Sequence, residues 1–388
     1  MSSVEFADRL KKLPPYLFVE IDKAKRAAIA EGRDVINLGI GDPDYPTPPH
    51  IIEAMKEAIS DPNNHHYALD AGLPELRQEI AKWFKNRFAV SLDPATEIYP
   101  LIGSKEGIAH LPLGVINPGD KVLLTDPAYP AYRPTIQFAG GEIINVPMEA
   151  DKGFLPDLDD VAKKADKVKM MVINYPNNPT AAVATREFYK GLVKLAKEKD
   201  FIILSDMAYS EVYYDGQKPL SIFEIDGAKD VAIEFHSLSK TYYMTGWRIG
   251  WACGNPTLVA ALAKVKSNYD SGIFQAIQVA GIAALKSDPQ ITEDMRVLYQ
   301  DRRDCLIQGL ADIGWTIEPP KAAFYVWAPL PKGFNDSMAT AKAFLDKADI
   351  VATPGVGFGP GGEGYIRMAL TVEKDRIQEA VGRLSKIL

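Results

Sequence analysis

The stretch VAIEFHSLSKTYYMTGWR, residues 231–248, decides how this chain can fold. It opens with a short apolar run that favours a β-strand, and Lys240 follows in a loop rich in serine and aromatic residues. Ser237, Ser239 and Arg248 surround this lysine in the sequence and together make an anion site. Lys240 is either a solvated surface residue or a group placed for chemistry at the end of a strand.

The sequence around this stretch repeats the same alternation. From about residue 97 to 254, short β-rich runs alternate with helical stretches, which predicts a mostly parallel sheet covered on both faces. The expected strands are 97–102, 121–125, 142–147, 169–174, 201–205, 231–236 and 249–253. Helices are expected between several of them, at 105–116, 157–165 and 185–199.

The pattern in the rest of the sequence predicts a second, smaller domain. An amphipathic helix at 16–31 and a short apolar run at 35–40 come first in the chain. Further helices are expected at 256–267, 275–286, 289–312, 337–347 and 373–387, with strands at 323–327 and 364–369. The predicted fold is therefore α/β, with a mostly parallel seven-stranded sheet in a large domain, residues 48–285. Residues 1–47 and 286–388 are expected to form a smaller discontinuous α+β domain.

Composition limits the classes of function. The 388 residues are 47% hydrophobic and 24% charged, as in ordinary globular proteins. The net charge of -7 argues against nucleic acid as a partner. Cys253 and Cys305 are too few for a disulfide framework. The chain shows neither an apolar run of membrane-spanning length nor the apolar core of a signal peptide, so we expect a cytoplasmic protein that does not cross a membrane.

Polar residues follow several of the expected strands, where an open α/β sheet binds its ligands. Gly103, Ser104 and Lys105 open a helix and form either a phosphate cradle or an ordinary capped turn. Tyr129 lies in a proline-stiffened loop and is either a stacking platform for a flat ring or a packed loop residue. Asn178 precedes a proline and is either a donor to a phenolate-type oxygen or a turn residue.

Asp206 ends an apolar strand, and a buried carboxylate there needs a partner such as a protonated ring nitrogen. Its alternative is an exposed or turn-capping carboxylate. Together with Lys240, these loops supply each group that pyridoxal-phosphate (PLP) chemistry requires: a phosphate cradle, a stacking ring, a donor to O3′, a carboxylate for the pyridine nitrogen and a Schiff-base lysine. No single loop is decisive, but their expected placement at one end of one sheet predicts a PLP site.

Four short motifs in this order resemble fold-type I aminotransferases of the class I/II group, and the resemblance covers essentially the whole chain. These motifs are NNPT (177–180), SDMAY (205–209), SLSK (237–240) and GWRIG (246–250). Longer blocks are more specifically similar to LL-diaminopimelate aminotransferases. They are LPPYLF (13–18), NLGIGDPDYPTP (37–48), HYALDAG (66–72), DSGIFQAIQ (270–278) and PGVGFGPGGEGYIRMALT (354–371).

The resemblance implies a role for each cofactor residue. Lys240 would form the Schiff base, Asp206 would pair with the ring nitrogen, and Tyr209 would share the hydrogen bond to O3′ with Asn178. Tyr129 would stack on the ring. The phosphate would be held by Ser104, Ser237, Ser239, Arg248 and the backbone of Lys105. Tyr67 would reach the phosphate in the neighbouring subunit's site, which implies a homodimer with shared active sites.

The resemblance also implies a substrate site, formed in part by the cofactor residues Tyr67, Tyr129 and Asn178. Arg367 would bind the α-carboxylate, since a guanidinium can grip it with two parallel hydrogen bonds. Lys105 is a candidate binder for a distal carboxylate. Tyr16 and the carbonyl of Gly41 are candidates for shaping the distal pocket, and Gln275 could reach in from the partner chain. No metal ligands are expected.

The expected reaction is transamination between LL-2,6-diaminopimelate and 2-oxoglutarate, giving tetrahydrodipicolinate and glutamate in lysine biosynthesis. The alternative is an aspartate, alanine or aromatic amino-acid aminotransferase of the same class. A β-lyase or decarboxylase would use nearly the same residues, whereas a PLP-dependent transcription regulator needs an added DNA-binding domain and a basic surface. Two positions depart from the family pattern: Ala181 follows NNPT where glycine is usual, and Met207 follows Asp206. Neither carries a mechanistic group, so we expect adjusted packing or rate.

Overall fold

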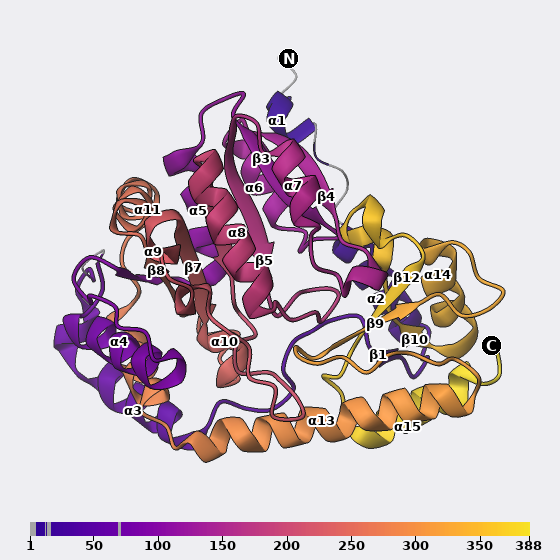
Figure 1. Cartoon of the computed structure of the whole chain (residues 1–388). Coiled ribbons are helices and arrows are strands. Elements are labelled where there is room, and N and C mark those ends of the chain that lie inside the picture. The colour runs from indigo at the N-terminus through magenta and orange to yellow at the C-terminus, as the bar shows by residue number, and fades with distance from the viewer. Residues whose placement is uncertain (1–4, 12, 14–16, 69–70) are drawn as a thin grey trace.

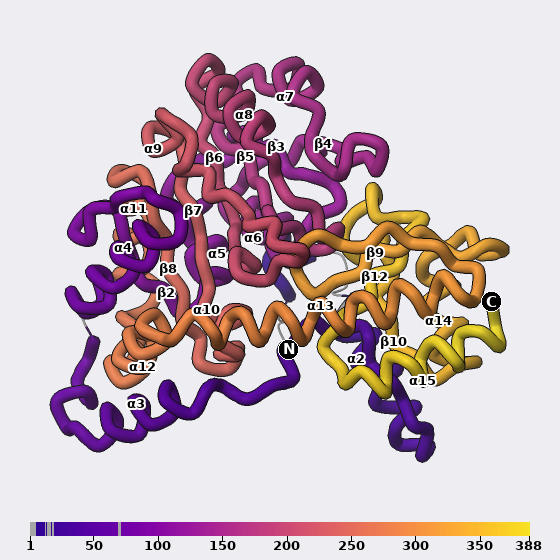
Figure 2. The backbone as a smooth tube through the Cα atoms, turned by 60° about the horizontal axis from the view of Figure 1, so that its bottom comes forward, coloured from indigo at the N-terminus to yellow at the C-terminus, as the bar shows by residue number. Residues whose placement is uncertain are grey.

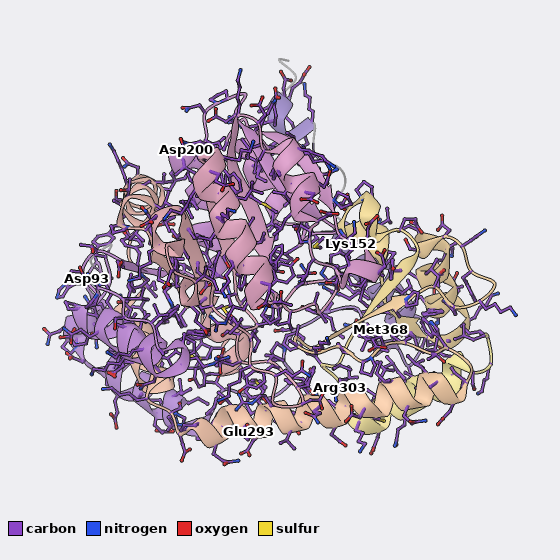
Figure 3. All side chains as sticks on the ribbon, in the orientation of Figure 1. Asp93, Lys152, Asp200, Glu293, Arg303 and Met368 are labelled. Carbon is purple, nitrogen blue, oxygen red and sulfur yellow. The ribbon has the colours of Figure 1, made fainter. Side chains whose placement is uncertain are left out.

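The computed structural model describes residues 5–11, 13, 17–68 and 71–388. The chain forms a larger region around an extended sheet and a smaller region beside it (Figure 1). Helix α13 (Pro289–Asp312) passes under both regions, with Glu293 near one end and Arg303 farther along (Figure 3). Among the described residues, no helix has both the length and the apolar character needed to cross a membrane.

The large sheet has the seven strands and the mostly parallel arrangement predicted from the sequence. Its order is β2-β8-β7-β6-β5-β3-β4. Only β8 runs antiparallel to its neighbours, β2 and β7, and the other pairs are parallel. The strands are β2 (Ile98–Leu101), β3 (Lys121–Asp126), β4 (Glu142–Pro147), β5 (Val168–Asn174), β6 (Ile202–Asp206), β7 (Ala232–Ser237) and β8 (Gly250–Gly254).

Helices cover both faces of this sheet because alternate strand residues point to opposite sides. In β5, Met170 and Val172 join one hydrophobic core, while Met171 and Ile173 join the other. The first core includes side chains of α5 (Ser104–Val115), α6 (Tyr132–Phe138) and α11 (Pro256–Tyr269). The second includes α4 (Pro74–Phe88), α7 (Leu158–Lys164), α8 (Arg186–Lys199) and α12 (Gln275–Leu285), and α3 (Pro49–Ser60) packs against α12.

The smaller region joins both parts of the chain that flank the large sheet. Strand β1 (Ile36–Asn37) pairs in parallel with β10 (Ile350–Val351). A separate antiparallel sheet has the order β11-β12-β9, with β9 at Tyr325–Pro329, β11 at Thr353–Pro354 and β12 at Tyr365–Ala369. A third hydrophobic core buries Ile36, Leu38, Ile350 and Ile366 together. The boundaries expected at residues 47/48 and 285/286 remain predictions.

The remaining helices complete this frame. In the tube view α13 and α15 run beside each other, and α2 and α14 lie in the same region (Figure 2). Their bounds are α2 (Leu17–Ala30), α14 (Ser337–Ala348) and α15 (Lys374–Leu384), and the short helices are α1 (Asp8–Lys11), α9 (Ala228–Val231) and α10 (Leu238–Thr241). The strand expected at 323–327 is displaced to Tyr325–Pro329, because Ala323 has a left-handed φ of 56° that an extended strand does not allow.

Candidate active site

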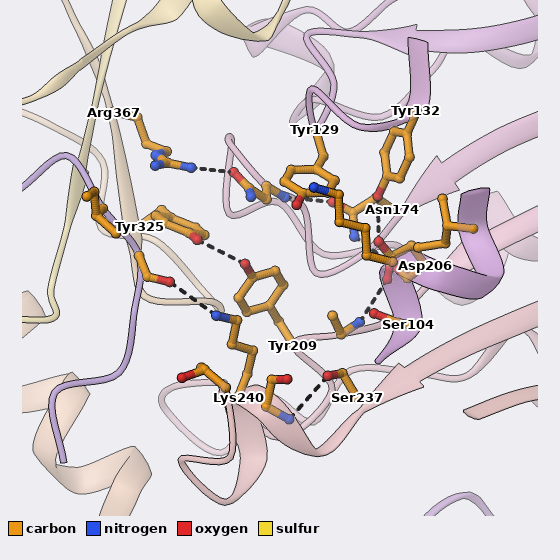
Figure 4. Close-up of a pocket in the computed structure, with 18 of the residues that line it drawn as sticks. Ser104, Tyr129, Tyr132, Asn174, Asp206, Tyr209, Ser237, Lys240, Tyr325 and Arg367 are labelled. Atoms are coloured by element: carbon orange, nitrogen blue, oxygen red, sulfur yellow. Dashed lines mark hydrogen bonds between the residues drawn. The ribbon is translucent and has the colours of Figure 1, made fainter. Parts of the chain in front are cut away.

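A cavity of about 250 Å³ lies beyond the carboxyl ends of the central strands, beside Tyr325 and Arg367 of the smaller sheet (Figure 4). Because parallel strands end at the same edge, the loops that follow them converge there. The cavity brings together twelve of the predicted site residues. They are Gly41, Ser104, Lys105, Tyr129, Asn178, Asp206, Tyr209, Ser237, Ser239, Lys240, Arg248 and Arg367.

Lys240 enters the cavity from α10, which begins directly after β7. The hydroxyl of Ser237 caps this short helix by accepting a hydrogen bond from the Ser239 backbone N–H at 3.1 Å. The Lys240 Nζ donates to the carbonyl of Gly41 at 3.2 Å. Burial lowers the pKa of Lys240 to about 8, although the nearby Asp42 carboxylate opposes the shift. At a pH near 8, much of this lysine carries no charge, and the neutral amine can act as nucleophile and base.

The loop after β2 forms an anion-binding cradle. Gly103 has a φ of 75°, and a Cβ at this position would lie 2.4 Å from Arg248 Nη2. Glycine therefore lets the backbone approach Arg248, and Ser104 then begins α5 with its free N–H groups. Arg248 Nη1 is anchored by the carbonyl of Thr245 at 2.9 Å and lies 3.5 Å from the Ser239 hydroxyl. This combination fits the phosphate of PLP.

The Asp206 carboxylate lies buried at the end of β6, in the position predicted for a partner of a ring nitrogen. The hydroxyl of Tyr132 donates to Asp206 Oδ2 at 2.7 Å, and the Ala208 backbone N–H donates to Oδ1 at 3.3 Å. Burial raises the pKa of Asp206 to about 6, and the hydrogen bonds from Tyr132 and Ala208 oppose this rise. A buried carboxylate of this kind gains stability from a cationic partner, so it fits a protonated pyridine nitrogen.

Arg367 extends from β12 into the cavity and is almost fully buried. Its Nη1 donates to Asn178 Oδ1 at 2.8 Å, and its Nη2 donates to the Gly39 carbonyl at 2.7 Å. The guanidinium also lies over the Tyr325 ring, 4.2 Å from the ring centre. These contacts hold a cationic, fork-shaped group beside the ring site, where it can receive a substrate carboxylate.

Two tyrosines and two asparagines orient the groups nearest the expected O3′ position. The hydroxyls of Tyr209 and Tyr325 are 2.9 Å apart. The backbone N–H of Asn178 donates to Oδ1 of Asn174, the last residue of β5, at 2.8 Å. This bond fixes Asn178 beside the end of the strand. The side-chain oxygen of Asn178, Oδ1, accepts a hydrogen bond from Arg367. The side-chain NH2 of Asn178 is therefore the group that can donate to a ligand oxygen.

Two predicted site residues do not line the cavity, and a third is not described. Tyr67 is 93% exposed and, like Gln275, does not line this cavity in a single chain. The expectation that both act in a neighbouring subunit's site stays a prediction. Tyr16 lies outside the described residues.

Sequence reasoning missed Tyr132, Asn174 and Tyr325, which line the cavity and orient its reactive groups. Tyr132 had a usable signal, because it follows Tyr129 by three residues, at the start of the helix after that loop. Tyr325 had none, because it comes from a different sheet. Its position depends on Gly41, where a Cβ would lie only 2.1 Å from the Tyr325 hydroxyl oxygen.

The backbone at Ala181 explains why glycine is usual at this position. Its φ is 60°, in the left-handed region where glycine is free of strain and other residues are not. The alanine methyl is buried in the core of the smaller region, which offsets part of this strain. Met207 is likewise buried, in a core of the large sheet. Both side chains therefore pack in hydrophobic cores, and the expected adjustment of packing or rate stays a prediction.

Comparison with known proteins gives the class to which this fold and site belong. Residues 33–384 match the family model described as aminotransferase class I and II, so the chain belongs to this family. It is therefore an enzyme that transfers amino groups, with the fold of the fold-type I aminotransferases, and its family uses PLP.

Individual relatives narrow the resemblance. The LL-diaminopimelate aminotransferase of Nitratidesulfovibrio vulgaris (strain DSM 19637 / Miyazaki F) is 53% identical over 389 aligned positions, with 100% of both chains covered. The substrate-bound structure of BacF from Bacillus subtilis is 36% identical, with a TM-score of 0.96 over 99% of this chain and 98% of that one. A single mutant of Thermus thermophilus aspartate aminotransferase is 30% identical, with a TM-score of 0.94 over 100% of both chains.

Proposed function

We propose that this chain binds PLP in the cavity and transfers an amino group from LL-2,6-diaminopimelate to 2-oxoglutarate, giving tetrahydrodipicolinate and glutamate. The convergence of Lys240, Asp206 and Arg367 on one cavity carries the reaction class. The choice of donor is supported by the full-length relative that is 53% identical and bears that name. This reaction places the enzyme in lysine biosynthesis and fits the cytoplasmic location expected from the sequence.

The residues around the cavity would hold the cofactor from several sides. The phosphate would be bound by Ser104, Ser237, Ser239, Arg248 and the backbone of Lys105. Asp206 would keep the ring nitrogen protonated, because its negative charge favours the N–H form. Tyr209 and Asn178 would donate to O3′, and Tyr129 would stack on the ring. When bound, PLP supplies an aldehyde that combines with amines and a ring that accepts electrons.

The remaining chemistry falls to Lys240 and Arg367. Arg367 binds the substrate α-carboxylate and so fixes the direction of the Cα–H bond relative to the ring. Lys240 would act as the base that takes the proton from the substrate Cα and would hold it for the return transfer. The same groups work in the reverse sense when 2-oxoglutarate enters as the second substrate.

The deciding experiment measures kcat/KM for LL-diaminopimelate, meso-diaminopimelate, aspartate, alanine and phenylalanine, with 2-oxoglutarate as acceptor. The LL isomer should be the best donor. The meso isomer should be poorer, because inversion at the far carbon leaves buried polar groups unpaired at about 1–3 kcal/mol each. A higher kcat/KM for aspartate or alanine would show that the substrate assignment is wrong. Continued turnover without 2-oxoglutarate, beyond one product per active site, would indicate a β-lyase or decarboxylase instead.

Lys105 provides a sharper test of the distal carboxylate. This residue lines the cavity but is exposed, so its replacement by methionine should leave the fold intact. Lys105→Met should raise KM for LL-diaminopimelate and for glutamate about tenfold, the effect of one lost charge-assisted hydrogen bond. Alanine, which has no distal carboxylate, is the matched control substrate. An equal loss with alanine would mean that Lys105 acts on the cofactor rather than on the distal group.

We also propose a homodimer in which Tyr67 and Gln275 complete the neighbouring subunit's site. The high exposure of Tyr67 in a single chain supports this placement, because a large aromatic residue in such a position gains burial from a second subunit.

A further inference from the structure

A fully buried lysine lies outside the cavity, between two helices that cover the large sheet. Lys266, near the end of α11, pairs through Nζ with Glu106 Oε1 and with Asp270 Oδ1, both at 2.7 Å. His110 Nδ1 lies 3.4 Å from the same Glu106 oxygen. Glu106, His110 and Asp270 are close enough to suggest a metal site, but the Lys266 ammonium already pairs with both carboxylates. Burying a lysine costs free energy unless its charge is paired in this way.

Glu106, on one side of this ion cluster, stabilises the turn that forms the phosphate cradle. The Glu106 carboxylate accepts a hydrogen bond from the backbone N–H of Ile102, and the Glu106 N–H donates to the Gly103 carbonyl at 3.2 Å. Glu106 therefore closes the turn in which Gly103 approaches Arg248. Burial favours a raised pKa for Glu106, but the nearby His110 ring, the Lys266 ammonium and the Ile102 backbone N–H lower it below its ordinary value. These groups together, the ammonium among them, favour the ionised form of the carboxylate that closes this turn.

The other side of the cluster holds the segment that follows α11. Asp270 ends this helix, and its backbone N–H donates to the Lys266 carbonyl at 2.9 Å. Residues 270–274 then lead directly to Gln275. Gln278 joins this segment to a second one, since its side chain donates to the Ile273 carbonyl at 2.6 Å and accepts from the Leu73 N–H at 2.7 Å. Leu73 lies six residues after Tyr67.

We propose that Lys266 is a positioning residue that couples the phosphate cradle of one subunit to the two segments, carrying Tyr67 and Gln275, that complete its neighbour's active site. The proposal rests on the proposed function for the roles of the cradle and of those two segments. It follows from the geometry that a single ammonium fixes both Glu106, at the start of α5, and Asp270, at the end of α11.

Near-isosteric variants separate the two sides of the cluster. Glu106→Gln should weaken PLP binding to the apoprotein about tenfold, whereas Asp270→Asn should leave that affinity within about twofold. Asp270→Asn should instead raise KM for the amino donor about tenfold with a smaller change in kcat. Lys266→Met should produce both effects. Lys264→Met, at an exposed position on the same helix, is the matched control and should produce neither.

The measurements are absorbance titration of apoprotein with PLP, steady-state kinetics of the holoenzyme, and thermal unfolding. If all three cluster variants lower Tm in parallel without the expected split between PLP affinity and KM, Lys266 is only structural and the proposal is wrong. Should Lys266→Met fail to fold, the other two variants still decide the question. PLP binding needs no turnover, so wild-type protein that binds PLP but transfers no amino group contradicts the proposed function separately.

Discussion

Lys240 and Asp206 carry opposite charges when ionised, and burial shifts the pKa of each in the direction that favours its neutral form. Burial lowers the pKa of Lys240 to about 8 and raises that of Asp206 to about 6. Each residue would be stabilised by a ligand that removes the need to bury its charge without a partner. Covalent attachment of an aldehyde removes the need to bury an ammonium, and a protonated ring nitrogen gives the carboxylate a counter-charge. Both shifts therefore fit the binding of PLP proposed for this site.

The shifted pKa of Lys240 predicts how the apoprotein reacts with PLP. The rate of covalent attachment, trapped by borohydride, should rise with pH around a midpoint near 8, because only the neutral amine is a nucleophile. Peptide mapping should locate the label on Lys240. Lys240→Ala should show no such label and should lose transamination by several orders of magnitude. Labelling of a different lysine, or near-normal turnover in the variant, would contradict the assigned mechanism.

Asp206→Asn should separate stability from activity. In the apoprotein the folded state holds the Asp206 proton up to about pH 6, whereas the unfolded state releases it near 3.8. Folding therefore binds a proton between these values, and stability from this group falls as pH rises through the window. Asp206→Asn should stabilise the apoprotein by about 1–3 kcal/mol at pH 8.

The advantage of Asp206→Asn should shrink as the pH is lowered toward 4, which thermal unfolding at several pH values would measure. The same variant should retain PLP but lose most of its transamination, because an amide cannot hold the ring nitrogen protonated. An active variant would mean that another residue faces the ring nitrogen.

At this scale the sequence predicted the residues whose chemistry is encoded locally. Lys240, Asp206 and Asn178 were found because each lies within four residues of the end of an expected strand. Tyr132 and Tyr325 were missed, although one donates to Asp206 and the other contacts Tyr209. Their roles depend on which loop and which sheet face the cavity, and a single sequence carries no direct signal for contacts of that kind.

At the scale of elements, the turn between β2 and α5 must pass unusually close to Arg248. Gly103→Ala should weaken PLP binding by tenfold or more, because the new Cβ would lie 2.4 Å from Arg248 Nη2 and displace it from the cradle. Gly119→Ala is the matched control. It has a similar left-handed φ of 89°, but a Cβ there would meet no atom within 4 Å.

Both glycine variants should lose about 1 kcal/mol of stability from backbone strain. Only Gly103→Ala should lose PLP affinity, as measured by titration of the apoprotein. Equal PLP affinity in the two variants would show that the cradle tolerates the added methyl.

Helix and strand periodicity predicted most elements but not all. Every strand of the large sheet lies within a residue or two of its expected place, because each is a short apolar run bounded by turn residues. Helix α4 was not predicted, although Leu76, Ile80 and Phe84 lie at helical spacing on its buried face. Strand β9 was misplaced because the left-handed φ of Ala323 is not visible in a β-favouring run.

At the scale of the whole molecule, the proposed sharing of active sites would make activity a property of two chains. Lys240→Ala and Tyr67→Phe subunits should each be impaired alone. Mixed heterodimers should regain about one wild-type-like site, because one site then contains both wild-type groups. Measuring activity after co-refolding the two variants tests this, with each homodimer as control. Activity no higher than either parent, with Tyr67→Phe clearly impaired, would contradict the placement of Tyr67 across the interface.

The pairing of β1 with β10 has a consequence for synthesis on the ribosome. Ile36 pairs with Ile350, so an early segment of the chain waits for a partner that is made 314 residues later. At about 5–20 residues per second, this wait lasts roughly 15–60 s. During that time Ile36 and Leu38 cannot be buried in their final core, which also needs Ile366. Arg367 follows immediately, so a nascent chain acquires its smaller core and the proposed carboxylate-binding group almost together, once this stretch has been made.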